Sequence, residues 1–260
     1  MVKRIIIASQ KGGQAKTTST VILSSILANI GYKVLVVDFD AQGNTTSMMT
    51  GESIYKYSGR TTMEAIREHN AAEYILEINE NLHLLPAEDM VATFPSYIYT
   101  QYSGNPLQAL RRTLAPVEGS YDFIFVDLPP SLGDSVVNAI VYADYIVIPA
   151  DYGAFGMDAL DRYVEFVDAS REEGHTKAEI LGILMVMKSA RSNHEKGIRK
   201  LIQDSYGDLV FGTEIRRRSK IKESAMHGVD LQHESMEDYM NFALEFVERI
   251  NQKEKEEHEQ

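Results

Sequence analysis

The sequence predicts a single α/β domain built on a doubly wound, mostly parallel sheet. Apolar runs of strand length recur along the chain, and helical patterns separate most of them. Strands that are apolar on both faces and alternate with helices are typical of parallel sheets covered by helices on each side. Neither a linker nor an internal repeat is evident in the 260 residues, so we expect one domain over residues 1–260.

The expected strands are short apolar runs, two of which end in an acidic residue. In chain order they cover residues 4–8, 33–38, 82–85, 121–127, 145–149 and 180–187. Helical spacing of apolar residues follows the first strand over residues 17–30, where Gly31 ends the helix. The same spacing predicts helices over residues 156–171, 195–206 and 235–255.

Three further segments have local signals. Thr61 and Glu64 have the spacing of a capping box, which predicts a short helix from Thr61 to His69. Residues 93–105 contain three tyrosines, and we interpret them as a surface turn whose rings pack on the sheet edge, with contact to a partner as the alternative. Residues 253–260 are highly charged, and we expect them to fray.

Composition excludes several classes of protein. The chain has no cysteine, which excludes disulfides, thiolate zinc sites and iron–sulfur clusters. The apolar run at the N-terminus is too short for a secretion signal, and no run approaches the roughly 18 apolar residues of a membrane span. We therefore expect a cytoplasmic location.

The segment SQKGGQAKTT, residues 9–18, lies between the first expected strand and the first expected helix. The adjacent Gly12 and Gly13 let backbone N–H groups surround an oxyanion, and the positive end of the helix points to the same place. Lys16 can reach the β- and γ-phosphates of a nucleotide, and Thr17 can ligate Mg²⁺. The structural alternative is a surface turn rich in glycine and lysine.

Lys11, directly before the glycine pair, distinguishes this loop. The strict Walker pattern requires glycine where this chain has Gln10 and Ala15, but KGGQAKTT resembles the deviant Walker box KGGxGK[ST][ST] of the ParA/MinD superfamily of P-loop ATPases. The resemblance implies that Lys11 reaches across an ATP-sandwich homodimer to the partner's phosphates. The Ala15 methyl group tightens the steric limits on the loop without removing a ligand. The implied ATP-binding residues are Gly12, Gly13, Gln14, Ala15, Lys16, Thr17 and Thr18.

Two acids follow the second expected strand, at the edge where open α/β sheets bind ligands. The run DFDAQGN, residues 38–44, resembles the ParA motif DxDPQGN and departs from it only at Ala41. The resemblance implies that Asp40 orients or activates the attacking water, and that Asp38 supports the loop and the metal shell. A turn cap is the alternative reading of two acids at a strand end.

A third motif, YDFIFVDLPPS over residues 121–131, has the Walker B form of an apolar strand that ends in an acid. The ParA family shares DxPPS, which implies that Asp127 belongs to the Mg²⁺ shell together with Thr17 and Asp38. Phosphoryl transfer needs positioning and charge neutralisation rather than a covalent intermediate. The implied catalytic residues are Lys11, Lys16 and Asp40.

A basic cluster, RRRSKIK, occupies residues 216–222 of a chain whose net charge is −12. Residues 213–228 resemble the ParA segment that follows a late strand and carries an arginine used on DNA, where this chain has Lys220. A second family arginine matches Arg191. The resemblance implies phosphate contacts without base reading. A solvated basic surface is the alternative. The implied DNA-binding residues are Arg191, Arg216, Arg217, Arg218, Lys220 and Lys222.

Together these resemblances imply a partition ATPase of the short ParA subtype, which lacks an N-terminal helix-turn-helix. ATP and Mg²⁺ would bring two chains together, the dimer would coat nucleoid DNA without sequence preference, and a ParB-type centromere-binding partner would stimulate hydrolysis and release. The glutamate-rich tail lacks the basic amphipathic helix of a MinD-type membrane protein, so no membrane partner is expected. A MinD-like positioning ATPase and a metabolic P-loop ligase are the alternatives. The sequence leaves open whether the cargo is a plasmid, a chromosome or a protein assembly.

Overall fold

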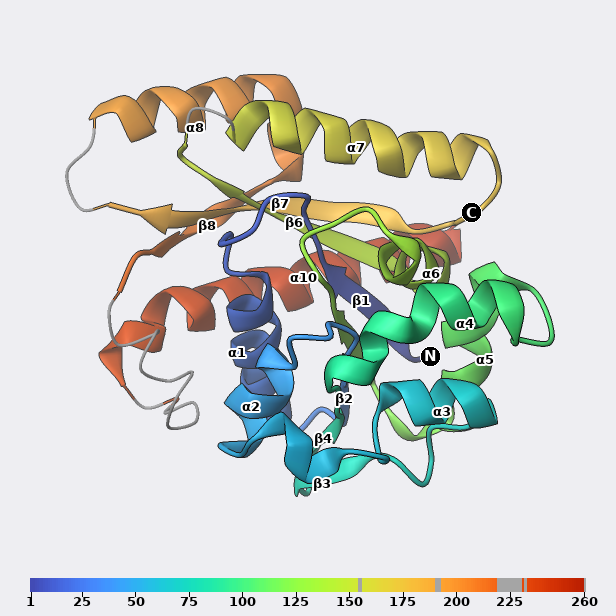
Figure 1. Ribbon diagram of the computed structural model, residues 1–260. Helices are drawn as coiled ribbons and strands as arrows, with labels where there is room; N and C mark the ends of the chain where they lie inside the picture. The colour runs from blue at the N-terminus through green and yellow to red at the C-terminus, as the bar shows by residue number, and fades with distance from the viewer. Residues whose placement is uncertain (154–155, 190–192, 219–230, 232, 260) are drawn as a thin grey trace.

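The computed structural model describes residues 1–153, 156–189, 193–218, 231 and 233–259 (Figure 1). Its centre is an eight-stranded sheet with the order β3-β4-β2-β5-β1-β6-β7-β8. Every neighbouring pair is parallel except β3 and β4. The predicted fold class, a mostly parallel sheet within one α/β domain, is therefore confirmed.

The six expected strands are present, and two more lie at the edges of the sheet. β3 is a four-residue strand of alternating exposure, and Gly212 and Glu214 interrupt the apolar run of β8, so neither has a clear sequence signal. β8 extends to Arg216, so the segment that we expected to follow a late strand begins inside it. The strands are β1 (Lys3–Ile7), β2 (Val34–Asp38), β3 (Leu76–Asn79), β4 (Leu82–Leu85), β5 (Phe123–Asp127), β6 (Tyr145–Asp151), β7 (Glu179–Lys188) and β8 (Val210–Arg216).

The expected helices are also present, including α3 with both hydrogen bonds of the capping box at Thr61. Two expectations were wrong. The region expected as a surface turn contains helix α4, because Phe94 and Ile98 are buried on one side of it. The tail expected to fray continues helix α10 to Glu259. The helices are α1 (Lys16–Asn29), α2 (Asn44–Thr50), α3 (Thr62–Glu68), α4 (Phe94–Thr100), α5 (Ala109–Leu114), α6 (Asp134–Tyr142), α7 (Gly156–Glu172), α8 (Asn193–Tyr206) and α10 (Glu237–Glu259).

The end of α10 is held by ion pairs to the sheet. Lys253 Nζ lies 3.0 Å from Glu179 Oε2 at the start of β7, and Glu254 pairs with Lys3 at the start of β1. Charged residues at the end of this helix thus have specific partners, which explains why a charged composition did not produce fraying. No helix in the described part of the chain combines the length and apolarity needed to cross a bilayer.

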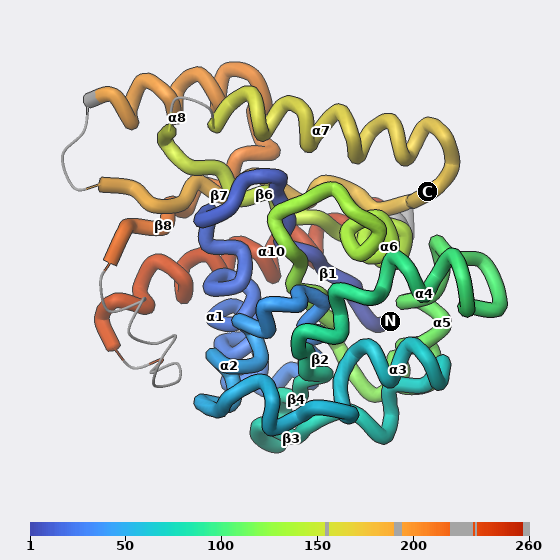
Figure 2. Tube along the Cα trace, in the orientation of Figure 1, coloured from blue at the N-terminus to red at the C-terminus, as the bar shows by residue number. Residues whose placement is uncertain are grey.

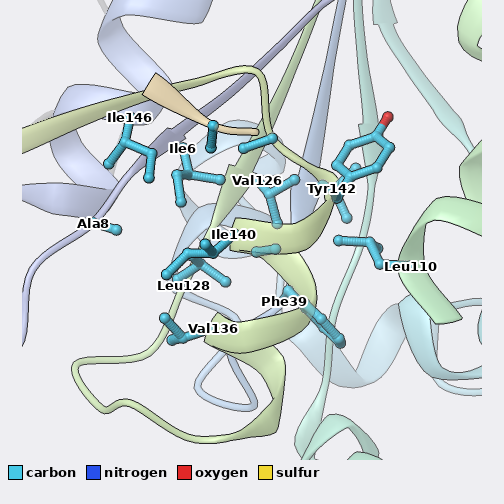
Figure 3. Close-up of a cluster of buried hydrophobic side chains, with 14 of the residues drawn as sticks. Ile6, Ala8, Phe39, Leu110, Val126, Leu128, Val136, Ile140, Tyr142 and Ile146 are labelled. Atoms are coloured by element: carbon cyan, nitrogen blue, oxygen red, sulfur yellow. The ribbon is translucent and has the colours of Figure 1, made fainter. Parts of the chain in front are cut away.

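Helices cover both faces of the sheet. Residues of α1 and α10 share one apolar cluster with one face, and residues of α3 to α8 share a second cluster with the other face. Figure 1 shows α7 and α8 side by side over strands β6 to β8. Alternate residues of β1 point to opposite clusters, with Ile6 on one side and Ile5 and Ile7 on the other. In Figure 3, Val136 and Ile140 of α6 pack beside Val126 and Leu128.

The central strands place several polar segments at one edge. β1, β2, β5 and β6 are parallel neighbours, so their carboxyl ends lie together. We call this edge the carboxyl rim; it comprises residues 8–16, 38–44, 127–133 and 151–153. Figure 2 shows the loop after β1, in dark blue, above the start of α1. Open α/β sheets bind ligands at this edge.

Candidate active site

The loop between β1 and α1 has the backbone of an anion cradle. Ala15, the N-cap residue of α1, has φ 56° and ψ 23°, and Gly13 has φ 77°. Left-handed residues before a helix N-terminus turn successive N–H groups toward one point, where the helix dipole also favours negative charge. The left-handed conformation is free for glycine but costs Ala15 roughly 1–2 kcal/mol. The departure at position 15 therefore preserves the loop geometry at the cost of strain.

The two lysines of the loop have different surroundings. Lys16 is buried, and its Nζ donates to the backbone oxygen of Lys11 at 3.2 Å. Burial lowers the pKa of Lys16, against the opposite effects of Asp127 and Asp40. Lys11 Nζ instead lies 2.5 Å from Asp151 Oδ2, at the end of β6. Lys16 therefore faces its own cradle, whereas Lys11 is held beside it.

Asp38 and Asp127 are fully buried register partners on adjacent strands. The hydroxyl groups of Thr17 and Thr45 each donate to Asp127 Oδ2 at 2.7 Å. The other oxygen, Asp127 Oδ1, is buried and has no hydrogen-bond partner among the described residues. Burial raises the pKa of both carboxyl groups, and the charge of Asp127 adds to the rise at Asp38. A cation beside Asp127 would stabilise the charged form of both carboxyl groups and so lower both pKa values.

The two acids after β2 have separate surroundings. Asp38 Oδ2 accepts from the backbone N–H of Thr46 at 2.8 Å and from its hydroxyl group at 2.7 Å, while Oδ1 accepts from the Asp40 N–H at 3.2 Å. Asp38 thus ties the loop to α2. Asp40 Oδ1 accepts from the Gln42 N–H at 3.0 Å, and Asp40 lines the open cleft described next.

A cleft of about 640 Å³ opens at the carboxyl rim. This volume lies within the range of small-molecule sites. It joins the cradle to the ends of β7 and β8 and to α10. Its lining residues are Gly12, Gly13, Ala15, Lys16, Thr17, Thr18, Asp40, Asn44, Leu128, Pro130, Asp151, Met187, Ile215, Arg216, Arg217, Arg218 and Tyr239.

The first part of the basic cluster lines this cleft and is partly neutralised. Arg216 Nε lies 2.9 Å from Asp238 Oδ1, and Arg216 Nη2 lies 3.0 Å from Glu237 Oε2. Arg218 lies within 4.0 Å of both acids. Arg217 is exposed, and its side chain makes no ion pair with any residue that the structure describes. The other expected DNA contacts, Arg191, Lys220 and Lys222, lie outside the described residues.

Sequence reasoning missed several residues of the site. Thr45 and Thr46 directly follow the DFDAQGN run, so their positions offered a signal. Asp151 ends an apolar strand, as Asp38 and Asp127 do, which was also a usable signal. Met187 and Tyr239 line the cleft without any local pattern that would mark them, because only tertiary structure brings them there.

The donor set suits Mg²⁺ held together with phosphate. In the described part of the chain, no cluster of three or more histidine, cysteine or acidic residues is available to a metal. Mg²⁺ does not need one, because it is usually bound by one or two carboxylates, substrate phosphates and water. The unpartnered Asp127 Oδ1 and the Thr17 hydroxyl group, which bonds to Asp127, supply such oxygen ligands.

These features define a P-loop nucleoside triphosphatase with a lysine before the glycine pair. A family model described as an AAA domain matches residues 2–180. The chromosome-partitioning ATPase Soj of Treponema pallidum is 30% identical, over 97% of this chain and 100% of that protein. The sporulation initiation inhibitor protein Soj of Bacillus subtilis is 33% identical, over 88% of this chain and 89% of that protein.

The fold is also similar to that of a solved structure that contains ATP. The ATP complex of a McdA variant from Cyanothece is 26% identical with a TM-score of 0.82, over 95% of each chain. The chain therefore belongs to the ParA/Soj-type partition ATPases, a family that hydrolyses ATP. The family resemblance and the ATPase activity predicted from the motifs are confirmed.

Proposed function

We propose that this chain binds Mg²⁺ and ATP in the cleft, pairs with a second copy in the ATP state, and then binds double-stranded DNA without sequence preference. The observation that carries the proposal is the placement of the two lysines: Lys16 is buried in the cleft, whereas Lys11 is 34% exposed and its ammonium group lies on Asp151. A partly exposed lysine beside the nucleotide site can exchange that ion pair for a contact with a second subunit. The partition functions named for the Soj relative of Treponema pallidum support the same reading.

The chain's residues divide the work on the nucleotide. The N–H groups around Gly12 and Gly13 and the ammonium group of Lys16 hold the phosphates. Thr17 and Asp127 would hold Mg²⁺, which supplies charge neutralisation at the phosphate oxygens when bound. The cleft beyond the cradle, lined by Met187 and Tyr239, has room for the rest of the nucleotide.

Hydrolysis needs a water molecule in line with the γ-phosphate. Asp40 lines the cleft and is the acid that would orient this water molecule. Its Oδ1 accepts the Gln42 N–H, which leaves Oδ2 outside that hydrogen bond. Lys11 of the partner subunit would neutralise charge that develops on the transferred phosphoryl group. A ParB-type partner that stimulates this step would end the dimeric, DNA-bound state.

DNA contact would come from the basic cluster, and the pairs already formed decide which members are available. Arg216 and Arg218 lie close to Asp238 and Glu237, so the exposed Arg217 is the best described candidate for a phosphate contact. Lys220 and Lys222 continue the cluster in the sequence. Contacts of this kind bind any duplex and weaken with salt. They would place the protein on the nucleoid.

The proposal is tested by duplex binding with Mg²⁺ and ATP, with ADP and without nucleotide, each at two salt concentrations. We expect ATP-dependent, salt-sensitive binding that Lys16→Ala abolishes. Reversal of charge by Arg217→Glu, Lys220→Glu and Lys222→Glu should abolish DNA binding. ATP binding is measured in the same variant, because Arg217 also lines the cleft. The matched control reverses Arg171, Lys177 and Lys255, which are exposed and do not line the cleft. Unchanged DNA retention after the first triple reversal would remove the basic cluster from the proposal.

A further inference from the structure

Asp151 has both carboxylate oxygens engaged within its own subunit. Oδ2 lies 2.5 Å from the Lys11 ammonium group, and Oδ1 accepts the Gly153 N–H at 3.0 Å. The side chains are partly shielded, with 34% of Lys11 and 19% of Asp151 exposed. The Gly153 bond fixes the rotation of the carboxylate, so the contact with Lys11 is oriented rather than incidental.

Two glycines leave the room that this pair occupies. A Cβ atom at Gly153 would lie 3.1 Å from Lys11 Nζ and 3.0 Å from Asp151 Oδ1. A Cβ atom at Gly156 would lie 2.7 Å from the backbone oxygen of Asp151, which is closer than real side chains approach. Gly153 therefore leaves the space that the Lys11–Asp151 pair occupies, and Gly156 leaves space for the backbone and carboxylate of Asp151.

The pair also competes with the role that Lys11 has in the proposed dimer. The ammonium group cannot hold Asp151 of its own subunit at 2.5 Å and contact phosphate in another subunit at the same time. One carboxylate carries less charge than a triphosphate, so a nearby ATP-loaded partner can displace it. Without such a partner, the Asp151 carboxylate binds the Lys11 ammonium group more strongly than water does.

We propose that Asp151 is a positioning residue that retains Lys11 in its own subunit until an ATP-loaded partner displaces it. This inference rests on the proposed ATP-sandwich dimer. An ion pair of this exposure shifts an equilibrium by roughly 1.5- to 5-fold. Each dimer breaks two pairs, so the effect on the dimerisation constant is the square, roughly 2- to 25-fold. Asp151 thus raises the threshold for dimer formation.

The first test measures Lys11 in the nucleotide-free protein, where no dimer is involved. Acylation of Lys11 by an N-hydroxysuccinimide ester is followed by peptide mass spectrometry. We expect faster acylation of Lys11 in Asp151→Asn and unchanged acylation in Asp204→Asn, a control that removes the same charge from an exposed site on α8. An unchanged Lys11 rate in Asp151→Asn would overturn the inference.

A second variant protects this test against misfolding. Gly153→Ala keeps every charge but places a methyl group 3.1 Å from Lys11 Nζ, and Gly153 is not among the residues of positive φ. It should displace Lys11 and increase its acylation in the same direction as Asp151→Asn. If neither folded variant changes the acylation rate, Asp151 does not retain Lys11.

The second test measures dimerisation by sedimentation velocity with Mg²⁺ and a non-hydrolysable ATP analogue. Asp151→Asn should tighten the dimer roughly 2- to 25-fold, and it should have no further effect when combined with Lys11→Ala. Lys11→Ala alone should weaken the dimer. If it does not, the sandwich dimer fails even though the acylation result stands. If Lys11→Ala weakens the dimer but Asp151→Asn fails to tighten it, the role of Asp151 fails and the sandwich stands.

Discussion

At the scale of single residues, the site places two buried carboxyl groups, Asp38 and Asp127, beside each other on adjacent strands. The two residues are register partners, and the charge of Lys16 lowers the pKa of Asp127 against the larger effect of burial. Asp38 is stabilised by three hydrogen bonds, whereas Asp127 has one oxygen without a partner in the described chain. The nucleotide-free protein therefore gives up stability at a position that Mg²⁺ can later compensate.

This arrangement predicts opposite effects of Asp127→Asn on stability and on ATP binding. The new amide nitrogen can take the position of the unpartnered Oδ1, while the remaining oxygen keeps both threonine hydrogen bonds. Loss of one buried charge should stabilise the nucleotide-free protein by about 1 kcal/mol, or about 2–4 °C in the unfolding midpoint. The further rise produced by Mg²⁺ and ATP should be largely lost.

Thermal unfolding with and without Mg²⁺ and ATP measures both effects. Asp122→Asn is the control, because Asp122 is exposed and bonds to the backbone N–H of Lys33 far from the carboxyl rim. A lower midpoint for nucleotide-free Asp127→Asn would mean that the buried carboxylate stabilises the fold by itself.

At the scale of elements, the edge strand β8 depends on α10. Its register against β7 shifts, so that Val210 pairs with Ile183 and Glu214 with Met185. The residues between them form a bulge. Within the bulge, the Gly212 and Thr213 N–H groups donate to Glu245 of α10 at 2.7 and 3.0 Å. The Glu245 carboxylate thus accepts backbone N–H groups of the edge strand that have no neighbouring strand to pair with.

We expect Glu245→Ala to destabilise the protein by about 1–2 kcal/mol, because two charge-assisted hydrogen bonds are lost and water replaces part of them. Amide hydrogen exchange at Gly212 and Thr213 should become faster, while exchange in β1 changes only with global stability. Glu248→Ala is the matched control, an exposed glutamate on the same helix. Equal protection of the bulge in both variants would show that Glu245 does not hold it.

The strands differ in how well the sequence could predict them. The six inner strands are mainly apolar, and the P-loop carries its chemistry in adjacent residues, so both can be found from local patterns. β8 cannot, because its bulge is stabilised by Glu245 rather than by its own apolar residues. The Lys11–Asp151 pair joins residues 140 positions apart, so it needed the strand order.

At the scale of the whole molecule, the cleft joins distant parts of the chain, from the loop after β1 to α10. A ligand that binds this cleft only in the folded protein should stabilise the whole domain. At a concentration of ATP 100 times its Kd, the gain is about 2.7 kcal/mol, or roughly 5–10 °C in the unfolding midpoint with Mg²⁺.

Thermal unfolding of three proteins tests this expectation. Lys16→Ala should lose most of the rise, and removal of Mg²⁺ with EDTA should reduce it in the wild type. Lys177→Ala, an exposed lysine between α7 and β7, should keep the full rise. A wild-type rise that survives in Lys16→Ala would place the nucleotide elsewhere on the molecule.

The ion pairs at the amino ends of the strands also decide how the protein can be observed. Lys3 and Glu254 bring the beginning of β1 and the last turns of α10 together, at the edge of the sheet opposite the carboxyl rim. Figure 1 shows the beginning of β1, beside the mark N, on the side away from the loop after β1. A fluorescent label attached close to Lys3 or Glu254 would therefore leave the nucleotide cleft and Lys11 uncovered. Such labels allow the movement of the ATPase to be imaged while its binding faces stay open.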